Sequence, residues 1–221
     1  MKVRKTPIVA LATLLGTGLA TGTVASAAFT GIEIDTLDSG YGIGTTYQIY
    51  ASVDGGEVDA VYGDADNLLI IEATTSFYQH AFGSHKPPAQ ALIDAFGSLA
   101  FDSFVSIGRL TSTDDNMLDI GIDWTSFNAG GAIETDNGTW FATPADAQVQ
   151  AVDGRVLIAQ FTITDDVEGN AGHVSGTINL QGKDADLTNW NAYGVEFNTL
   201  PAPGALSLLG LAGLATRRRR K

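Results

Sequence analysis

Aspartates are the side chains best suited to chemistry in this sequence, and they outnumber the glutamates 19 to 6 in 221 residues. Calcium binds several oxygen ligands presented by flexible loops, and short runs of Asp and Asn can supply them. Aspartate is also a common turn residue, and for any single cluster the solvated turn is the favoured interpretation. We therefore expect no required cofactor, with calcium as an optional ligand at Asp64, Asp66, Asn67, Asp114 and Asp115.

Three tryptophans are candidates for contact with sugar rings, because an aromatic face packs well against the apolar face of a pyranose. Trp124 continues an alternation of apolar residues and is expected in the core. Trp140 lies beside an expected turn, and Trp190 lies between two asparagines. The sequence therefore predicts a sugar contact at Trp140 or Trp190 rather than at Trp124.

The residue patterns of common enzyme classes are missing from the sequence. It has no cysteine for a nucleophile, a disulfide or a thiolate zinc site, and no G-x-S-x-G motif. His80, His85 and His173 lack the spacing and the further ligand that a zinc site needs. Carboxylate pairs of the glycosidase type arise by chance among 25 acidic residues. We expect a protein without catalytic activity.

Charge is distributed unevenly along the chain. Eight of the 12 Lys and Arg residues lie in the first five and last five positions. Residues 28–200 carry all 25 acidic residues and only four basic ones, a net charge of −21. Nucleic-acid binding needs clustered Lys and Arg and is excluded for this segment. The charge favours a domain that folds in saline or divalent-rich surroundings, since counterions screen its self-repulsion.

The first 27 residues have the features of a secretory signal peptide. Lys2, Arg4 and Lys5 form a positive region, a mostly apolar stretch runs from Ile8 to Leu19, and Ala25-Ser26-Ala27 supplies small residues for cleavage. The apolar stretch is too short and too interrupted by glycine for the ~20 residues of a spanning helix. We expect export, with a signal peptidase removing residues 1–27.

A second apolar segment, residues 204–216, follows Pro201-Ala202-Pro203 and precedes the cluster Arg217-Arg218-Arg219-Arg220-Lys221. As a helix it would extend about 20 Å, less than the ~30 Å of a bilayer's hydrocarbon core. The terminal cations stay on the cytoplasmic side during export. We therefore expect residues 201–221 to hold the chain in the membrane transiently.

The proline pair, the apolar helix expected over Ala205–Ala215 and the arginine cluster resemble the PEP-CTERM sorting signal of Gram-negative bacteria. The resemblance covers about the last 21 residues. It implies that an exosortase-like membrane protease removes the tail, and that the protein reaches the cell surface, the outer membrane or the extracellular matrix. Proteins of this kind are often linked to extracellular polysaccharide. Ala202 departs from the family, which has glutamate between the two prolines.

The segment between the two ends, residues 28–200, has the length of one domain. Stretches that alternate apolar and polar residues are typical of antiparallel strands with one face in water. The expected strands are Ile32–Leu37, Thr45–Val53, Glu57–Tyr62, Leu68–Ala73, Phe101–Ile107, Leu118–Thr125, Arg155–Thr164, Val174–Gln181 and Tyr193–Phe197.

Local signals add a hairpin and a helix. Asp136-Asn137-Gly138 predicts a hairpin within Ile133–Phe141, because Asn-Gly tolerates positive φ. Pro88 and Gly97 predict a helix over Pro88–Phe96. In Leu118–Thr125 the buried face is expected to consist of Leu118, Ile120, Ile122 and Trp124.

Many short strands without alternating helices predict an all-β fold, an antiparallel and jelly-roll-like β-sandwich, with short apolar helices in the signal and in the tail. The strands Thr45–Val53, Glu57–Tyr62 and Val156–Thr164, with the turn Asp54-Gly55-Gly56, are similar to cohesin and carbohydrate-binding-module sandwiches of bacterial surface proteins. We expect an exported, non-catalytic protein with a structural or adhesive role, in contact with extracellular polysaccharide. The alternatives are a carbohydrate-binding module and a polysaccharide-active enzyme.

Overall fold

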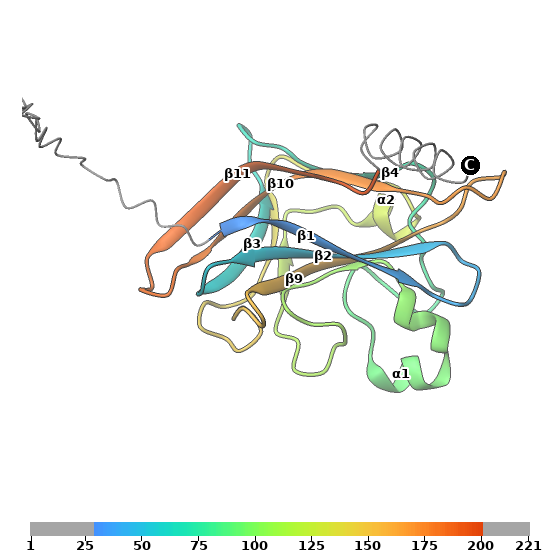
Figure 1. Ribbon diagram of the computed structural model, residues 1–221, viewed down its shortest axis with the longest axis horizontal. Helices are drawn as coiled ribbons and strands as arrows, with labels where there is room; N and C mark the ends of the chain where they lie inside the picture. The colour runs from blue at the N-terminus through green and yellow to red at the C-terminus, as the bar shows by residue number, and fades with distance from the viewer. Residues whose placement is uncertain (1–28, 201–221) are drawn as a thin grey trace, which may run out of the picture.

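Alternating apolar residues generate the long strands of the fold. In β2 (Thr45–Val53), the side chains of Tyr47, Ile49, Ala51 and Val53 are all buried and face the core. The computed structural model describes residues 29–200, which form two antiparallel sheets packed face to face (Figure 1). The expected all-β sandwich is confirmed. The signal segment and the sorting tail, with their expected helices, lie outside the described residues.

The first sheet has four antiparallel strands in the order β1–β2–β9–β5. Besides β2, its strands are β1 (Phe29–Asp38), β5 (Phe104–Val105) and β9 (Arg155–Ile163). The expected strands Ile32–Leu37 and Arg155–Thr164 are thus confirmed. Phe101–Ile107 contributes only two residues of strand, because its first residue ends a 3-10 helix.

The second sheet has seven strands, and β10 (Val174–Lys183) is its central member. One edge of β10 pairs with β11 (Asn189–Asn198) along the whole strand. The other edge pairs first with β4 and then with β3, so that these two strands lie end to end. The remaining strands of this sheet are β3 (Glu57–Gly63), β4 (Leu69–Ala73), β6 (Leu118–Ile120), β7 (Ile133–Thr135) and β8 (Gly138–Phe141).

Helices are short and peripheral in the described part of the chain. The predicted helix over Pro88–Phe96 is realised as α1 (Gln90–Ala95), which the 3-10 helix η1 (Gly97–Phe101) follows. A second helix, α2, spans Thr125–Asn128. In Figure 1, α1 lies on the side of the four-stranded sheet that faces away from β10 and β11. None of the helices within residues 29–200 is long and apolar enough to cross a membrane.

The predicted hairpin over Ile133–Phe141 is wrong. β7 pairs with β4, and β8 pairs with β3 and β6, whereas β7 and β8 do not pair with each other. Because β3 and β4 lie end to end, the chain that runs beside them continues in one direction from β7 into β8. Asn137 has no positive φ, so the Asn-Gly pair makes a step between two strands rather than a reversal.

The predicted strand Leu118–Thr125 is correct only over its first three residues, and its faces are inverted. Leu118 is 55% exposed and Ile120 is 67% exposed. The opposite face carries Asp119. Its carboxylate forms an ion pair with Lys86 and accepts a hydrogen bond from the Trp124 indole N–H. A polar side chain with two partners therefore occupies the inner position.

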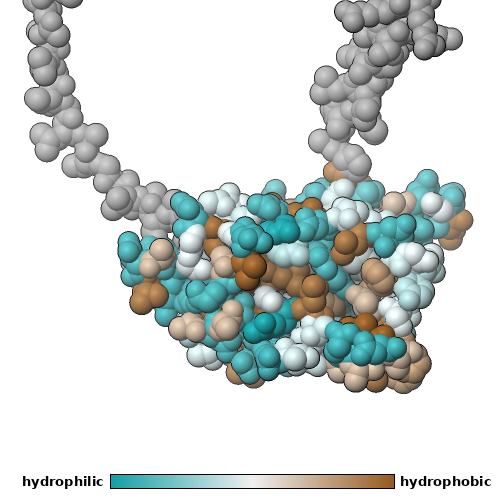
Figure 2. Space-filling model, turned by 60° about the horizontal axis from the view of Figure 1, so that its bottom comes forward, coloured by the Kyte–Doolittle hydropathy of each residue, from teal (hydrophilic) through white to brown (hydrophobic). Residues whose placement is uncertain are grey.

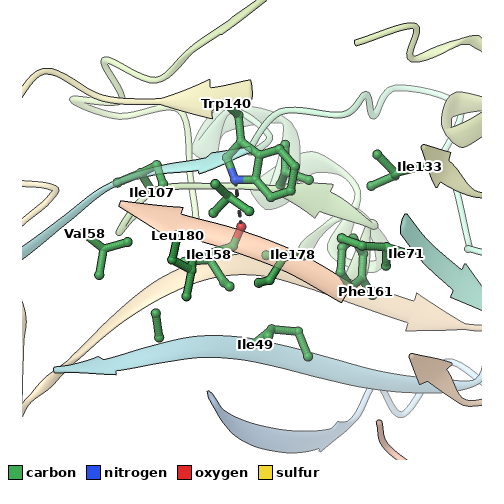
Figure 3. Packing of buried hydrophobic residues seen from close by; sticks show 14 of the residues in the cluster. Ile49, Val58, Ile71, Ile107, Ile133, Trp140, Ile158, Phe161, Ile178 and Leu180 are labelled. Carbon is green, nitrogen blue, oxygen red and sulfur yellow. Dashed lines mark hydrogen bonds between the residues drawn. The ribbon is translucent and has the colours of Figure 1, made fainter. Parts of the chain in front are cut away.

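The core lies between the two sheets, and Trp140 is its largest fully buried side chain (Figure 3). Trp140 comes from β8, and its indole N–H donates to the carbonyls of Ser106 and Ile158. Ile49 from the four-stranded sheet and Leu180 from the seven-stranded sheet pack in the same cluster. Two backbone acceptors thus satisfy the one polar atom of a ring that is otherwise packed against apolar groups.

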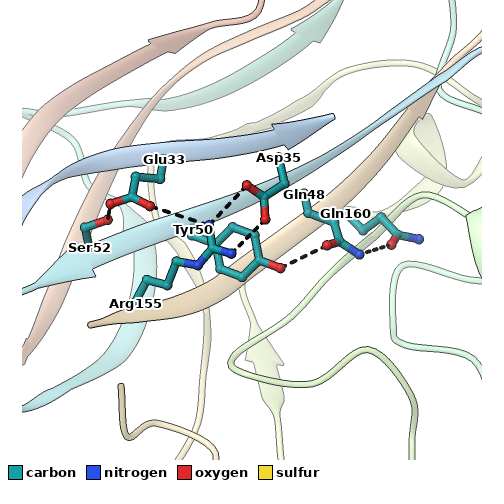
Figure 4. Close-up of polar contacts among 7 residues, drawn as sticks. All are labelled: Glu33, Asp35, Gln48, Tyr50, Ser52, Arg155 and Gln160. Atoms are coloured by element: carbon teal, nitrogen blue, oxygen red, sulfur yellow. Dashed lines mark hydrogen bonds and ion pairs between the residues drawn. The ribbon is translucent and has the colours of Figure 1, made fainter. Parts of the chain in front are cut away.

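The outer face of the four-stranded sheet is polar, and part of it is covered by residues 99–103. Gln160 and Thr162 are buried there although they point away from the core, because Gln160 donates to the carbonyls of Ala100 and Asp102. The sequence predicts a face in water at these positions, and the covering segment explains the difference. Figure 4 shows the rest of the network, which contains Glu33, Asp35, Gln48, Tyr50, Ser52 and Arg155.

Arg155 joins three strands at the open part of this face. Its guanidinium donates to both carboxylate oxygens of Asp35, at 3.1 and 2.8 Å, and lies 4.0 Å from the centre of the Tyr50 ring. We expect Arg155→Ala to lower the free energy of unfolding by about 1 kcal/mol, since a partly exposed pair is well screened by water. Urea titration at low and high salt measures this, and the loss should shrink at high salt.

Arg155→Lys is the matched control, because it keeps the charge and removes the two-pronged hydrogen bond. Its stability should lie between those of the wild type and Arg155→Ala. Identical midpoints for all three proteins would contradict the assigned role of Arg155.

Candidate functional site

The first group of predicted calcium ligands lies in the loop between β3 and β4. Asp64 Oδ1 accepts hydrogen bonds from the backbone N–H groups of Asp66 and Asn67 and from the Asn67 side-chain amide. The Asp64 carboxylate therefore closes the turn that separates two strands lying end to end. Asp66 is exposed at the tip of this loop.

The second group lies before β6 and is also built into turns. Asp115 Oδ1 accepts from the backbone N–H of Met117 and from the Gln148 side chain, whereas Asp114 is exposed and has a φ of 53°. Within residues 29–200, no group of three or more His, Cys, Asp or Glu side chains is placed to hold a metal ion. The turn interpretation accounts for the geometry of both groups.

The two tryptophans predicted to contact sugar are not exposed, and that part of the prediction is wrong. Trp140 is 0% exposed in the core, and Trp190 is 6% exposed and stacks on Phe29. Trp140 is on a strand with neighbours on both sides, and its alternation with Thr139 and Phe141 directs it inward. Trp124 is buried, as expected. The sorting-signal residues Pro201, Pro203 and Arg217 to Arg220 lie outside the described residues.

Surface hydropathy alone does not single out a site. On the face shown in Figure 2, hydrophilic residues surround a group of hydrophobic ones near the middle of the domain. Exposed apolar side chains also occur far apart in the described chain, among them Phe82, Leu118 and Val152. Cavities and buried polar groups are therefore the better guide.

A hollow with a volume of about 580 Å³ lies on the outer face of the seven-stranded sheet. Strand register explains its shape. Ala60 on β3 lies opposite Phe141 on one neighbouring strand and opposite Gln181 on the other. Because alanine has only a methyl group, the larger side chains stand above it and form two walls. Tyr62 and Ile120 complete the lining on the next row of the sheet.

A β-bulge places an acidic side chain in this hollow. The register between β3 and β10 shifts so that Val58 pairs with Gly182 and Ala60 pairs with Gln181, which leaves Asp59 as the extra residue. A bulge puts two consecutive side chains on one face. Asp59 and Ala60 accordingly both line the hollow, and the Asp59 side chain is buried.

Asp59 forms a pair of carboxyl groups with Glu57, the preceding outward residue of β3. Burial, and to a lesser extent the neighbouring Glu57, raise the pKa of Asp59 to about 7. Glu57 Oε1 and Asp59 Oδ1 are buried and have no hydrogen-bond partner within the described residues. A proton on Asp59 removes the repulsion that two buried like charges would have.

The rest of the Glu57 environment fixes that side chain in place. Glu57 Oε2 accepts from the backbone N–H of Ala145 and from the Gln150 side chain. Lys183 Nζ lies 3.8 Å from Glu57 Oε1. These three contacts hold the Glu57 carboxyl group in place. The site is a hollow with aromatic and amide walls, and the buried carboxyl of Asp59 is part of its lining.

A second buried carboxyl, Asp102, lies far from this hollow, beneath the loop that precedes α1. It is 0% exposed, its Oδ1 accepts from the backbone N–H of His80, and burial raises its pKa to about 7. A side chain at Gly83 would collide with its carboxylate. Asp102 therefore holds this loop in place.

Asp59, Ala60 and Gln181 were not among the residues predicted from the sequence, because a bulge does not follow the period of two. One signal was present. The buried valines of β3, Val58 and Val61, are three positions apart, which a regular strand cannot place on one face.

Comparisons of the chain with protein-family models, curated proteins and solved structures found no significant match. The function of the chain is therefore inferred from its own sequence, geometry and chemistry.

Proposed function

We propose that this chain is an exported, non-catalytic protein of the bacterial cell surface or extracellular matrix, with an adhesive or structural role. The feature that carries the proposal is the pair of targeting patterns that flank the domain, a signal peptide over residues 1–27 and a sorting tail over residues 201–221. A signal peptidase and an exosortase-like protease would be the processing partners.

The domain between these ends is consistent with that role. A cysteine-free β-sandwich keeps its fold in any redox environment, and its charge of −21 keeps it soluble. Asp64 and Asp115 cap turns, and calcium is an optional ligand in this proposal, not a required one. Adhesion would use an exposed sheet face, and extracellular polysaccharide remains the proposed partner. Because Trp140 and Trp190 are buried, other residues would make the sugar contact.

The test is the intact mass of the protein recovered from the cells that produce it. We expect the mass of a chain that begins near Ala28 and ends near Pro201, with or without added glycan. A variant with Arg217 to Arg220 replaced by glutamine is the matched control and should keep its tail, since the terminal cations hold the chain in the membrane. An unchanged 221-residue mass in the wild type would refute the proposal.

A further inference from the structure

The hollow over Ala60 has the size and the lining of a site for a small polar ligand with apolar faces. Its volume of about 580 Å³ falls within the usual range for ligand pockets. Tyr62 and Phe141 provide aromatic surface, while Gln181, Asn137 and Asp59 provide hydrogen-bonding groups. Pyranose rings combine apolar C–H faces with hydroxyl edges, so they match both parts of this lining.

The charge of the site favours a neutral ligand. Burial raises the pKa of Asp59 to about 7, so at pH 6 this carboxyl is mostly protonated and neutral, and Lys183 places a cation beside Glu57. The surrounding domain is strongly acidic, which disfavours anionic ligands.

A second hollow, of about 480 Å³, lies on the same face of the sheet and includes Ser175, Thr177 and Glu196. β10 contributes Thr177 to the second hollow and Gln181 to the first. Four residues of strand place these positions about 13 Å apart. Tyr193, which is 57% exposed, contacts Tyr62 edge to face between them. A chain of several sugar units would reach both hollows, whereas a single unit would fill only one.

We propose that the outer face of the seven-stranded sheet binds an extended neutral saccharide chain, which lies over Ala60 between Tyr62, Phe141 and Gln181 and continues past Tyr193 toward Thr177. This deepens the adhesive function proposed above and rests on it for its biological setting. Gln181 binds hydroxyl groups, and the aromatic rings pack against the sugar faces.

The experiment is affinity electrophoresis of the protein purified from the cells that produce it, at pH 6. The gels contain xyloglucan, galactomannan or a mixed-linkage β-glucan as neutral probes, alginate as an anionic probe and chitosan as a cationic probe. At least one neutral polymer should retard the protein, and alginate should not. A hexasaccharide of the retarding polymer should bind about tenfold more tightly than its disaccharide, because it reaches both hollows.

Variants assign the binding to this face. Tyr62→Ala and Gln181→Ala should each lower the association constant for the retarding polymer about tenfold. The matched control is Tyr41→Ala, because Tyr41 is a tyrosine on the surface, 58% exposed, that lies in the β1–β2 turn beside Phe101 and outside both hollows. Gln181 is exposed, so its variant tests the site even if Tyr62→Ala fails to fold.

Three results would overturn the inference: no retardation by any neutral polymer, retardation by chitosan alone, or wild-type binding in both folded variants. Equal affinity for the disaccharide and the hexasaccharide would overturn the extended mode. The mass measurement is independent of all these results. A correctly processed protein that binds no neutral polymer would refute the saccharide site and leave the export proposal standing. An unprocessed protein that binds a neutral polymer would refute the export proposal and leave the saccharide site standing.

Discussion

The folded domain is expected to be more stable at pH 5 than at pH 8, in contrast to the usual loss of stability in acid. Asp59 and Asp102 are both buried, and burial is the main cause that raises the pKa of each to about 7. In the unfolded chain both groups return to the ordinary value of 3.8. Between these values the folded state holds two protons that the unfolded state has released, so stability falls as pH rises.

The expected change is large for a domain of this size. One pKa unit corresponds to about 1.4 kcal/mol, so the two carboxyls together should lower the free energy of unfolding by on the order of 4–5 kcal/mol between pH 5 and pH 8. Above pH 7 both groups are ionised in both states, and the loss levels off. Burial lowers the pKa of His85, so this residue makes stability rise with pH. The two carboxyls outweigh this single group.

Urea titrations at pH 5, 6, 7 and 8 and at constant ionic strength measure this dependence. Asp59→Asn and Asp102→Asn place a neutral amide where each protonated acid stands, so each should raise stability at pH 8 and flatten the curve. The exposed Asp54 gives the matched control, Asp54→Asn, which should leave the slope unchanged. A wild-type stability that is flat or rises from pH 5 to pH 8 would contradict the prediction.

Asn179→Ala should be the most damaging substitution of a polar side chain in the seven-stranded sheet. Asn179 is 0% exposed on β10, and its amide donates to the carbonyls of Tyr62 and Asn67. Its Oδ1 accepts from the backbone N–H of Gly194 in β11. One side chain thereby ties together the end of β3, the loop before β4 and the bulge in β11.

Removing this amide leaves three backbone groups without their partner. Each unsatisfied buried group costs about 1 kcal/mol or more, so the free energy of unfolding should fall by about 3 kcal/mol, a large part of the 5–15 kcal/mol of a typical domain. Urea titration measures the loss, and hydrogen exchange at the Gly194 amide should speed up. Asn191→Ala, at an exposed position on β11, is the control and should change stability little. If Asn179→Ala unfolds at the wild-type urea midpoint, the three hydrogen bonds of Asn179 do not stabilise the sheet as proposed.

Several long strands could be predicted from the sequence because apolar residues recur at every second position along them. β2 and β10 are clear cases, and the predicted start of each is correct. The alternation fails where a polar side chain finds partners inside, as Asp119 does with Lys86 and Trp124. There a three-residue strand is followed by the helix α2 instead of more strand residues.

The hairpin and the candidate site depend on pairings that a local pattern does not contain. Asn137 and Gly138 have the composition of a reversal, but β3 and β4 lie end to end along β10, and the chain beside them must continue in one direction. The hollow over Ala60 likewise depends on which residues of β8 and β10 lie opposite it. Strand register is a long-range property, so composition and spacing could not give the site.

The pairing of β11 with β10 also determines how the domain would resist a mechanical pull. β11 is the last strand before Leu200, and its hydrogen-bonded ladder to the central strand runs from Asn189 to Asn198. Tension applied to the chain after Leu200 acts along this strand, so it loads the whole ladder in shear instead of opening one bond at a time. Forced unfolding follows the unfolding rate rather than the equilibrium stability. A surface domain pulled from this end would therefore withstand more force than one whose last strand peels away.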